Sequence, residues 1–537
     1  MKYPGIFSPI VVILIILSLL GSLMIYYSTT WGPWAFSDST ESIVSARNLL
    51  AGKGLGLLSP SGNFKPLSLH PPFYALILSG IGLTGINLIV AARWLNIFLF
   101  AATIFISGTF TYKLVHSNWA ALSTSLTLLV MPPLVDISSG AMTELLFIFL
   151  AILGIFLLTI YLEQPKIYFL ILTSVIMGMA FLTRLNGVVL MFIGLAAILF
   201  TDRISWMRRL ANALLYSLLS MTPMVMWLTR AYSQTGALAG RNYHFSTNFW
   251  KELQGFRLQF MQILWSWLPY QHLLPTYSHN LSRNIFIALT LLILLLLGLL
   301  TYKRYFSKNT VLTSRSGFKF LLFWIFFGVG NLLLLIASYL NTNLQPSIDD
   351  RTLLPIQVAM VFIILTSLLL IIRAYHLPAV TGWVCAGLVL IMNLSYANTS
   401  LKTISQWHIS GFGYTSKHWQ TSLTLQKVRN FPDDVPIITN EASALLLLVD
   451  RPAYDFCELP CDQNGSLRYG DSESDVVQSI FREDGAALVL FYPFCILDDP
   501  SWYSVTLEQY ATLTQNLTQY FCSCDGAIYF YPSNQQY

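Results

Sequence analysis

Long apolar segments separated by short polar connections make up most of the first 396 residues of this 537-residue chain. Segments such as VVILIILSLLGSLMIYY (11–27) approach the roughly 20 apolar residues needed to cross a bilayer. No small-residue cleavage site follows this first segment, so we expect a retained span and not a signal peptide. The pattern predicts eleven spans, near residues 6–27, 89–112, 118–135, 142–162, 167–183, 186–201, 210–229, 284–301, 318–340, 353–373 and 379–396.

One apolar segment, PPFYALILSGIGLTG (71–85), has only 15 residues and is short for a span. If it crossed the membrane, every later connection would change sides. The basic segments TDRISWMRR (201–209) and YKRYFSK (302–308) would then lie outside, against the positive-inside tendency. We therefore expect an interfacial or re-entrant helix here.

The pattern changes from about residue 411. GYTSKHWQTSLTLQKVRNFPDDVPIITN (413–440) is typical of helix, turn and strand, and EASALLLLVD (441–450) of a further helix. GAALVLFYP (485–493) and AIYFYP (527–532) are typical of buried strands. This alternation predicts a small α/β layer with some parallel pairing.

Composition and charge add the orientation. The chain is 55% hydrophobic and only 10% charged, whereas soluble domains contain about 25% charged residues. Residues 1–396 hold 23 Lys+Arg and 9 Asp+Glu (+14), and residues 397–537 hold 7 and 16 (−9), which together give the net +5. Connections on one side of the predicted spans, with Lys2, hold 12 basic residues against two acids, which places that side in the cytoplasm. This partition argues for membrane orientation and against nucleic-acid binding.

The predicted fold class is thus a polytopic α-helical membrane protein with about eleven transmembrane helices and a small C-terminal α/β extracytoplasmic domain. Residues 1–396 form the membrane domain, with large outer loops at 28–88 and 230–283, and residues 397–537 form the soluble domain. We expect a multi-pass protein of the plasma or inner membrane with a cytoplasmic N-terminus.

Five of the six cysteines lie in the C-terminal domain: Cys457, Cys461, Cys495, Cys522 and Cys524. In an oxidising outer compartment some of them should form disulfides. The sequence does not determine their connectivity, and an odd number leaves one thiol over. A zinc site is the less favoured alternative, because the spacing of metal ligands is missing.

Two acidic residues are candidates for catalysis. Asp38 lies in the first outer loop, before the helix-like ESIVSARNLL (41–50), where it is a candidate general base; the simpler alternative is an N-cap. Glu144 lies where the fourth span begins, and a carboxylate at the edge of hydrocarbon favours a functional role. Its alternatives are an interfacial anchor in water or an acid favoured by the helix dipole.

Cationic side chains gather on the same predicted outer face. Guanidinium groups suit bidentate recognition of phosphate oxygens, and a histidine adds a proton-dependent charge. Taken singly, each arginine more simply snorkels to lipid headgroups or pairs with Asp349 and Asp350. The candidate substrate-binding residues are His70, Arg184, Arg230, Arg241 and Arg351.

Nucleotide chemistry has no motif in this chain. We find no Walker loop, no dinucleotide-binding glycine fingerprint and no metal-binding Cys/His spacing. An outward-facing enzyme would not meet cytoplasmic nucleotide donors, so its donor should be a lipid phosphate carried by the bilayer.

These residues and their order resemble the GT-C class of membrane glycosyltransferases, in the branch of protein O-mannosyltransferases and lipid A aminoarabinose transferases (glycosyltransferase family 39-like). Five features match the family's motifs in order: Asp38 followed by SARNLLAGKGLG, His70 before Pro71-Pro72, Glu144, GMAFLTRLNG (178–187) and RTLLP at Arg351. Two departures are Ser42, where an aromatic is usual, and Ser39, where protein mannosyltransferases carry Glu.

The resemblance implies an inverting transfer of a sugar from a polyprenyl-phosphate donor to an extracytoplasmic lipid, glycan or protein. Asp38 would take the acceptor's proton, and the arginines, with His70, would stabilise the leaving phosphate. No cofactor is expected; a divalent metal is the alternative. Competing hypotheses are a transporter or flippase for lipid-linked sugars, disfavoured because no internal repeat is visible, and a non-catalytic membrane scaffold.

Overall fold

A computed structural model describes residues 9–201, 204–236, 249–270, 315–341, 346–455, 485–491, 514 and 517–530. The chain falls into two compact units. The first, called the helical unit here, comprises Met1–Thr30, Ser68–Ile77 and Val90–Ile409. The second, the sheet unit, comprises Trp31–Leu67, Leu78–Ile89 and Ser410–Tyr537.

Apolar segments of the first 410 residues form helices, as their composition predicts. The helices associated with the helical unit are α1 (Pro9–Ser28), α3 (Phe73–Gly82), α4 (Leu88–Val115), α5 (Asn118–Val130), α6 (Pro132–Ser138), α7 (Thr143–Glu163), α8 (Ile167–Thr183), η1 (Leu185–Gly187), α9 (Val188–Leu199), α10 (Trp206–Thr235), α11 (Phe249–Ser266), α13 (Arg315–Asn341), α14 (Asp350–Ala374) and α15 (Ala379–Ser410). Ten of the eleven predicted spans coincide with these helices, and the one at 284–301 lies outside the described residues.

Within the described residues, seven helices are long and apolar enough to cross a membrane, or eight if α5 and α6, which meet at a bend of 60°, form one broken span. Helices α8 and α9 are apolar but have only 17 and 12 residues. Helix α3 has 10 residues, about 15 Å at 1.5 Å per residue, which is too short to cross. The protein is a mostly helical, multi-pass membrane protein, as predicted.

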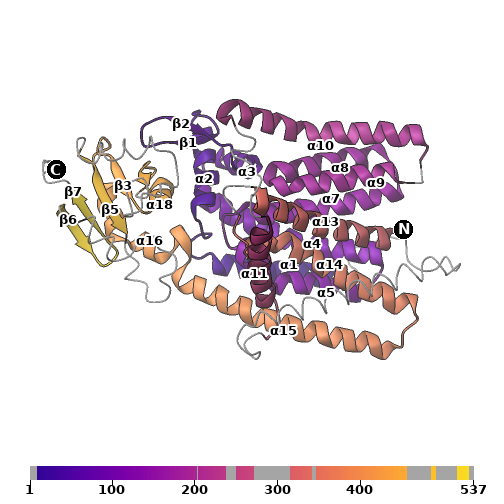
Figure 1. Ribbon diagram of the computed structural model, residues 1–537. Helices are drawn as coiled ribbons and strands as arrows, with labels where there is room; N and C mark the ends of the chain where they lie inside the picture. The colour runs from indigo at the N-terminus through magenta and orange to yellow at the C-terminus, as the bar shows by residue number, and fades with distance from the viewer. Residues whose placement is uncertain are drawn as a thin grey trace. The chain divides into compact units, whose positions relative to one another are not determined.

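Helix α7 lies at the centre of the helical unit. Its apolar residues are almost all buried, and it packs against α8, α9 and α13, while α8 and α10 pack together (Figure 1). Helices at the periphery instead expose large apolar side chains, a distribution that a hydrocarbon solvent permits. Examples are Leu19, Leu23, Phe98, Leu214, Met226 and Leu388.

The C-terminal part of the sheet unit has the predicted α/β character. Its elements are η4 (Gly413–Thr415), α16 (Lys417–Thr421), α17 (Leu423–Arg429), β3 (Ile437–Thr439), α18 (Ala442–Leu448), β4 (Tyr454–Asp455), β5 (Ala487–Phe491), β6 (Thr518–Ser523) and β7 (Gly526–Phe530). The strand order is β4-β3-β5-β7-β6, in which β3 is parallel to β4 and β5, and β7 is antiparallel to β5 and β6. Strand β5 is buried along its whole length, as its unbroken apolar pattern predicts.

The first outer loop is part of the same unit. It contains α2 (Ser37–Leu50) and an antiparallel hairpin of β1 (Gly56–Leu58) and β2 (Phe64–Pro66). The N–H of Tyr414 donates to the carbonyl of Ala35 at 2.9 Å, and the hydroxyl of Thr415 to that of Pro33 at 2.8 Å. Helix α2 also packs on α18. The loop that carries Asp38 is therefore built on residues of the C-terminal region.

Two of the cysteines expected to form disulfides, Cys522 and Cys524, are free and exposed. Cys457, Cys461 and Cys495 lie outside the described residues. Pairing among those three stays a prediction.

Candidate functional site

Glu144 is held between two guanidinium groups in the helical unit. Its Oε1 lies 2.5 Å from Nη1 of Arg184 and 3.6 Å from Nε of Arg351. Thr143 donates from its hydroxyl to Oε2 of Glu144 and accepts from Arg184, both at 3.2 Å. The side chain of Glu144 is 2% exposed, whereas those of Arg184 and Arg351 are 24% and 31% exposed. A ligand can thus reach the guanidiniums while the carboxylate between them stays covered.

The turn between α6 and α7 places Glu144. Two prolines open α6, so the chain bends there instead of continuing α5. The side-chain amide of Asn96, on α4, donates to the carbonyls of Ser138 and Gly140 at the end of α6. Glu144 then enters α7 in its first turn, where the helix dipole favours an acid.

Arg184 lies at a sharp break in the chain. It has an extended backbone (φ −149°, ψ 142°) between the end of α8 and the short η1. Gly187 ends η1, and a Cβ there would lie 2.4 Å from the backbone nitrogen of Phe181. Only glycine permits so close an approach, which explains why the TRLNG motif needs its last residue to direct Arg184 towards Glu144.

Arg351 is fixed by the start of α14. Asp349 is the N-cap and forms a capping box with Thr352, at 2.8 Å from the Thr352 N–H to Oδ1 and 3.1 Å from its own N–H to the threonine hydroxyl. The carboxylate of Asp349 also lies 4.0 Å from Nε of Arg351. The expected pairing of Arg351 with Asp349 is therefore present, alongside the contact with Glu144.

Asp38 lies in the sheet unit, in the first turn of α2 and half-buried. The N-cap is Phe36, whose side chain makes no capping hydrogen bond. The capping alternative for Asp38 is therefore wrong, because the helix begins one residue before it. Near the end of α2, the side-chain amide of Asn48 donates to the carbonyl of Gly56 at 2.8 Å. After the helix, Gly54 has φ +103°. These two features explain the residue types of the NLLAGKGLG segment.

His70 belongs to the helical unit and lies half-buried just before α3. One helical turn later, Tyr74 is fully buried. Burial raises the pKa of the Tyr74 hydroxyl, and the negative charge of Glu144 raises that pKa further. Tyr74 is thus within electrostatic reach of Glu144. Tyr74 and Thr143 have no sequence signal that separates them from the chain's many other hydroxyl-bearing residues.

The other predicted cations are placed differently. The guanidinium of Arg230, on α10, lies over the ring of Trp227 at 5.1 Å from its centroid. Arg241 lies outside the described residues. Within the part of the chain that the structure describes, no group of three or more His, Cys, Asp or Glu is arranged to hold a metal. The expectation that no cofactor is used stays a prediction.

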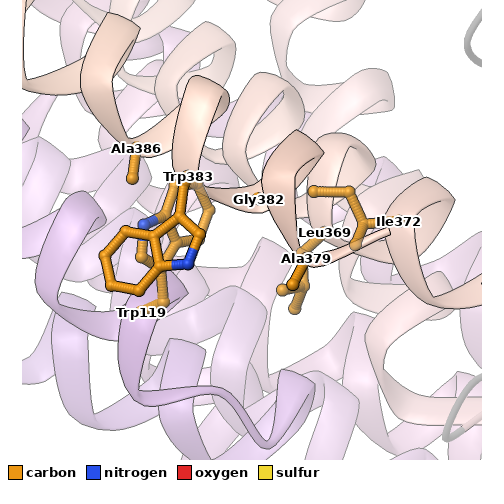
Figure 2. A pocket seen from close by; sticks show the side chains of 7 residues that line it. All are labelled: Trp119, Leu369, Ile372, Ala379, Gly382, Trp383 and Ala386. Atoms are coloured by element: carbon orange, nitrogen blue, oxygen red, sulfur yellow. The ribbon is translucent and has the colours of Figure 1, made fainter. Parts of the chain in front are cut away.

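A cavity of about 250 Å³ lies elsewhere in the helical unit. Figure 2 shows that residues of α5, α14 and α15 line it, mainly with apolar surface, among them Trp119, Leu369 and Trp383. Leu369 is 18 residues after Arg351 on α14, about 27 Å along the helix. This cavity is therefore separate from the cluster of Glu144, Arg184 and Arg351, called the Glu144 cluster below.

No protein-family model and no curated protein matches the sequence. Solved structures do match. The crystal structure of ArnT from Cupriavidus metallidurans bound to undecaprenyl phosphate is 13% identical, covers 96% of this chain and 97% of that chain, and gives a TM-score of 0.57. A cryo-EM structure of the arabinofuranosyltransferase AftD from Mycobacteria is 12% identical, covers 96% of this chain and 41% of that chain, and gives a TM-score of 0.54. The chain has the fold of these GT-C proteins, as its motifs predict.

Proposed function

We propose that the protein is a membrane glycosyltransferase that transfers a sugar from a polyprenyl-phosphate donor to an extracytoplasmic acceptor. The observation that carries this proposal is the cluster of Glu144, Arg184 and Arg351, which three separate helix ends supply in a chain with the GT-C fold. The fold match alone would not assign an activity.

The cluster suits an anionic phosphate. Both guanidiniums are partly exposed, and such groups bind phosphate oxygens through paired N–H donors. The similar ArnT structure is bound to undecaprenyl phosphate, which supports a lipid phosphate as the donor's anionic part. His70, Arg230 and Arg241 are proposed as further contacts to this donor.

In the proposed reaction, an acceptor hydroxyl attacks the anomeric carbon of the sugar. Asp38 takes the hydroxyl proton, since an ordinary carboxylate is ionised at neutral pH. The bond between the anomeric carbon and the phosphate oxygen breaks, and the polyprenyl phosphate leaves with the electron pair. A single displacement of this kind inverts the anomeric configuration. Arg184 and Arg351 stabilise the charge that gathers on the leaving phosphate.

Glu144 is proposed to act within this site through the guanidiniums. It is covered and paired with both, so it fixes their direction and limits the net positive charge they present. A carboxylate in this position is better suited to orienting the two phosphate-binding guanidiniums than to taking a proton from an acceptor hydroxyl.

The test uses purified full-length protein in nanodiscs, a panel of labelled polyprenyl-phosphate sugars and an extract of envelope acceptors. Wild-type protein should release polyprenyl phosphate and form a labelled product. Asp38→Asn should reduce transfer roughly 10²- to 10⁴-fold without loss of donor binding. Glu41→Gln, which changes another carboxylate of α2, is the matched control and should transfer normally.

Wild-type transfer by Asp38→Asn protein would remove Asp38 as the base. Movement of intact labelled donor across the membrane without transfer would favour the flippase hypothesis. Absence of both activities with every donor would favour a scaffold.

A further inference from the structure

Asp350, the residue before Arg351, binds the segment that follows α11. Its Oδ1 accepts hydrogen bonds from the indole N–H of Trp267 at 2.7 Å and from the side-chain amide of Gln357 at 3.2 Å. Trp267 is half-buried, and Gln357 is buried. Hydrogen bonds to a charged acceptor are stronger than neutral ones, particularly where water is scarce.

Trp267 belongs to the outer loop, immediately after α11. Its carbonyl accepts from the hydroxyl of Tyr396 on α15 at 2.7 Å, and the N–H of Tyr270 donates to the hydroxyl of Ser395 at 2.8 Å. The segment 267–270 is therefore tied to α14 by one polar contact and to α15 by two.

An apolar cluster supports the same arrangement. Phe256 and Phe260 of α11 pack with Tyr339 of α13 and with Leu353 and Ile356 of α14, and the ring of Trp267 packs against this cluster. Figure 1 shows α11 running across α13. Helix α11 thus packs on α13 and α14, and the hydrogen bond from Trp267 to Asp350 joins the residue after its C-terminal end to the first turn of α14.

Three consecutive residues of that turn have different partners. Asp349 caps the helix, Asp350 binds Trp267, and Arg351 faces Glu144. Successive side chains on a helix point about 100° apart, so the contacts of Asp350 and Arg351 lie on different sides of one rigid turn. A shift of that turn would move the guanidinium relative to Glu144.

We propose that Asp350 is a positioning residue: its bond to Trp267 locks the segment after α11 onto the first turn of α14 and thereby holds the Arg351 guanidinium where the donor phosphate binds. This inference rests on the proposed function, since it assumes that Arg351 binds the donor. It assigns a role to the loop residue Trp267 and explains the second aspartate of the IDDR segment.

The test measures KM for the donor and kcat in full-length protein, and the Kd of polyprenyl phosphate without turnover. Trp267→Phe keeps an aromatic side chain but removes the indole N–H, and should raise both the donor KM and the Kd about tenfold, because a hydrogen bond to a charged group is lost. Asp350→Ala should match it, while Asp350→Asn, which keeps the acceptor oxygen, should largely restore wild-type values. Trp250→Phe, at an exposed position of α11, is the matched control and should change neither.

Two further variants separate positioning from general damage. Tyr396→Phe removes only the hydroxyl that bonds the carbonyl of Trp267 and should raise KM in the same direction, which keeps the test open if Trp267→Phe protein does not fold. In an Arg351→Ala background, Trp267→Phe should cause no additional rise.

Wild-type KM and Kd in both Trp267→Phe and Tyr396→Phe protein, or full additivity with Arg351→Ala, would overturn the positioning role while leaving the proposed function intact. Wild-type protein that binds polyprenyl phosphate but transfers no sugar would contradict the proposed function, and the Kd values would still decide the role of Asp350. Wild-type protein that does neither would contradict both.

Discussion

At the scale of single residues, Glu144 and the two arginines beside it have different roles in one small site. A carboxylate that is 2% exposed needs its charge compensated, and Arg184 and Arg351 provide this while keeping a quarter to a third of their own surfaces accessible. The same pairing that stabilises Glu144 therefore orients two phosphate-binding groups. Asp38, in contrast, lies in the first turn of α2 and is not its N-cap.

Arg351→Ala should weaken donor binding roughly 10- to 100-fold, because a charge-assisted hydrogen bond of about 1.5 to 3 kcal/mol is lost. The donor KM and the Kd of polyprenyl phosphate report this change. Arg373→Ala is the matched control: this residue is at the other end of α14, where it donates to the carbonyls of Val115 and His116. Equal effects of the two substitutions would show that Arg351 acts on α14 in general and not on the donor.

The residues of the Glu144 cluster were predictable because charged side chains are rare in apolar sequence and therefore conspicuous. Their pairing was not, since Glu144, Arg184 and Arg351 are far apart along the chain. Trp267 and Tyr74 escaped prediction for the opposite reason. Aromatic residues form 14% of the chain, and a tryptophan near a membrane interface is ordinary, so neither position differs from its neighbours until the contacts are known.

Helix ends, at the scale of the elements, explain most of the motifs that the sequence shows. The GMAFLTRLNG segment ends α8 and turns the chain back, and the DDRTLLP segment caps and starts α14. Pro355, inside α14, has no N–H to donate to the carbonyl of Arg351 four residues earlier. The apolar pattern predicted the positions of the described helices well, including the short α8, predicted at 167–183. It did not predict the bend of 60° that divides the predicted span 118–135 into α5 and α6.

Asp525 illustrates a polar contact that stabilises an element. It is 4% exposed, and it accepts hydrogen bonds from Ser422, Ser523 and Thr424, so the start of α17 is joined to the turn between β6 and β7. Burial acts to raise the pKa of Asp525, but these hydrogen bonds outweigh it and hold the pKa below its ordinary value.

Asp525→Asn should therefore destabilise this region at neutral pH by about 1 to 3 kcal/mol. Because the folded-state pKa is lowered, the stabilisation is present above the ordinary pKa of about 3.9 and is lost as the pH falls through the folded value. Hydrogen exchange of the β5 and β7 amides in full-length protein should show a large difference from wild type at pH 7 and a smaller one below about pH 4. Asp450→Asn, which breaks an exposed ion pair with Arg47, should cost only about 0 to 1 kcal/mol. A pH-independent difference for Asp525→Asn would exclude ionisation as its cause.

Across the whole molecule, the distribution of charge can be read from the sequence, whereas contacts between distant segments cannot. The excess of +14 before residue 397 and of −9 after it can be counted directly, and it predicted a membrane part followed by a water-facing part. The sequence did not predict that the first outer loop belongs to the same unit as the C-terminal region. Contacts such as that of Thr415 with Pro33 join residues 382 positions apart. Nothing local in either segment specifies such a pairing.

The basic connections between the helices predict the orientation of the whole protein in the membrane. Three variants, each with one cysteine in an otherwise cysteine-free chain, should be treated in intact cells with a membrane-impermeant maleimide. The cysteine positions are Ser61→Cys in the turn between β1 and β2, Asn118→Cys at the start of α5, and the native Cys522; all three positions are exposed. We expect labelling at 61 and 522 in intact cells, and at 118 only after permeabilisation, because the connection before α5 is on the basic side.

The reverse pattern would contradict more than the topology. A polyprenyl-phosphate sugar reaches an acceptor outside the cytoplasm only if the phosphate is bound at the outer surface. The Glu144 cluster lies at the start of α7, and Asn118 lies at the start of α5, before the bent pair of helices α5 and α6. In the predicted topology, where 118–135 is a single span, one crossing separates them. A cysteine at 118 that reacts in intact cells would then place Glu144, Arg184 and Arg351 at the cytoplasmic surface, where the proposed donor and acceptor could not meet.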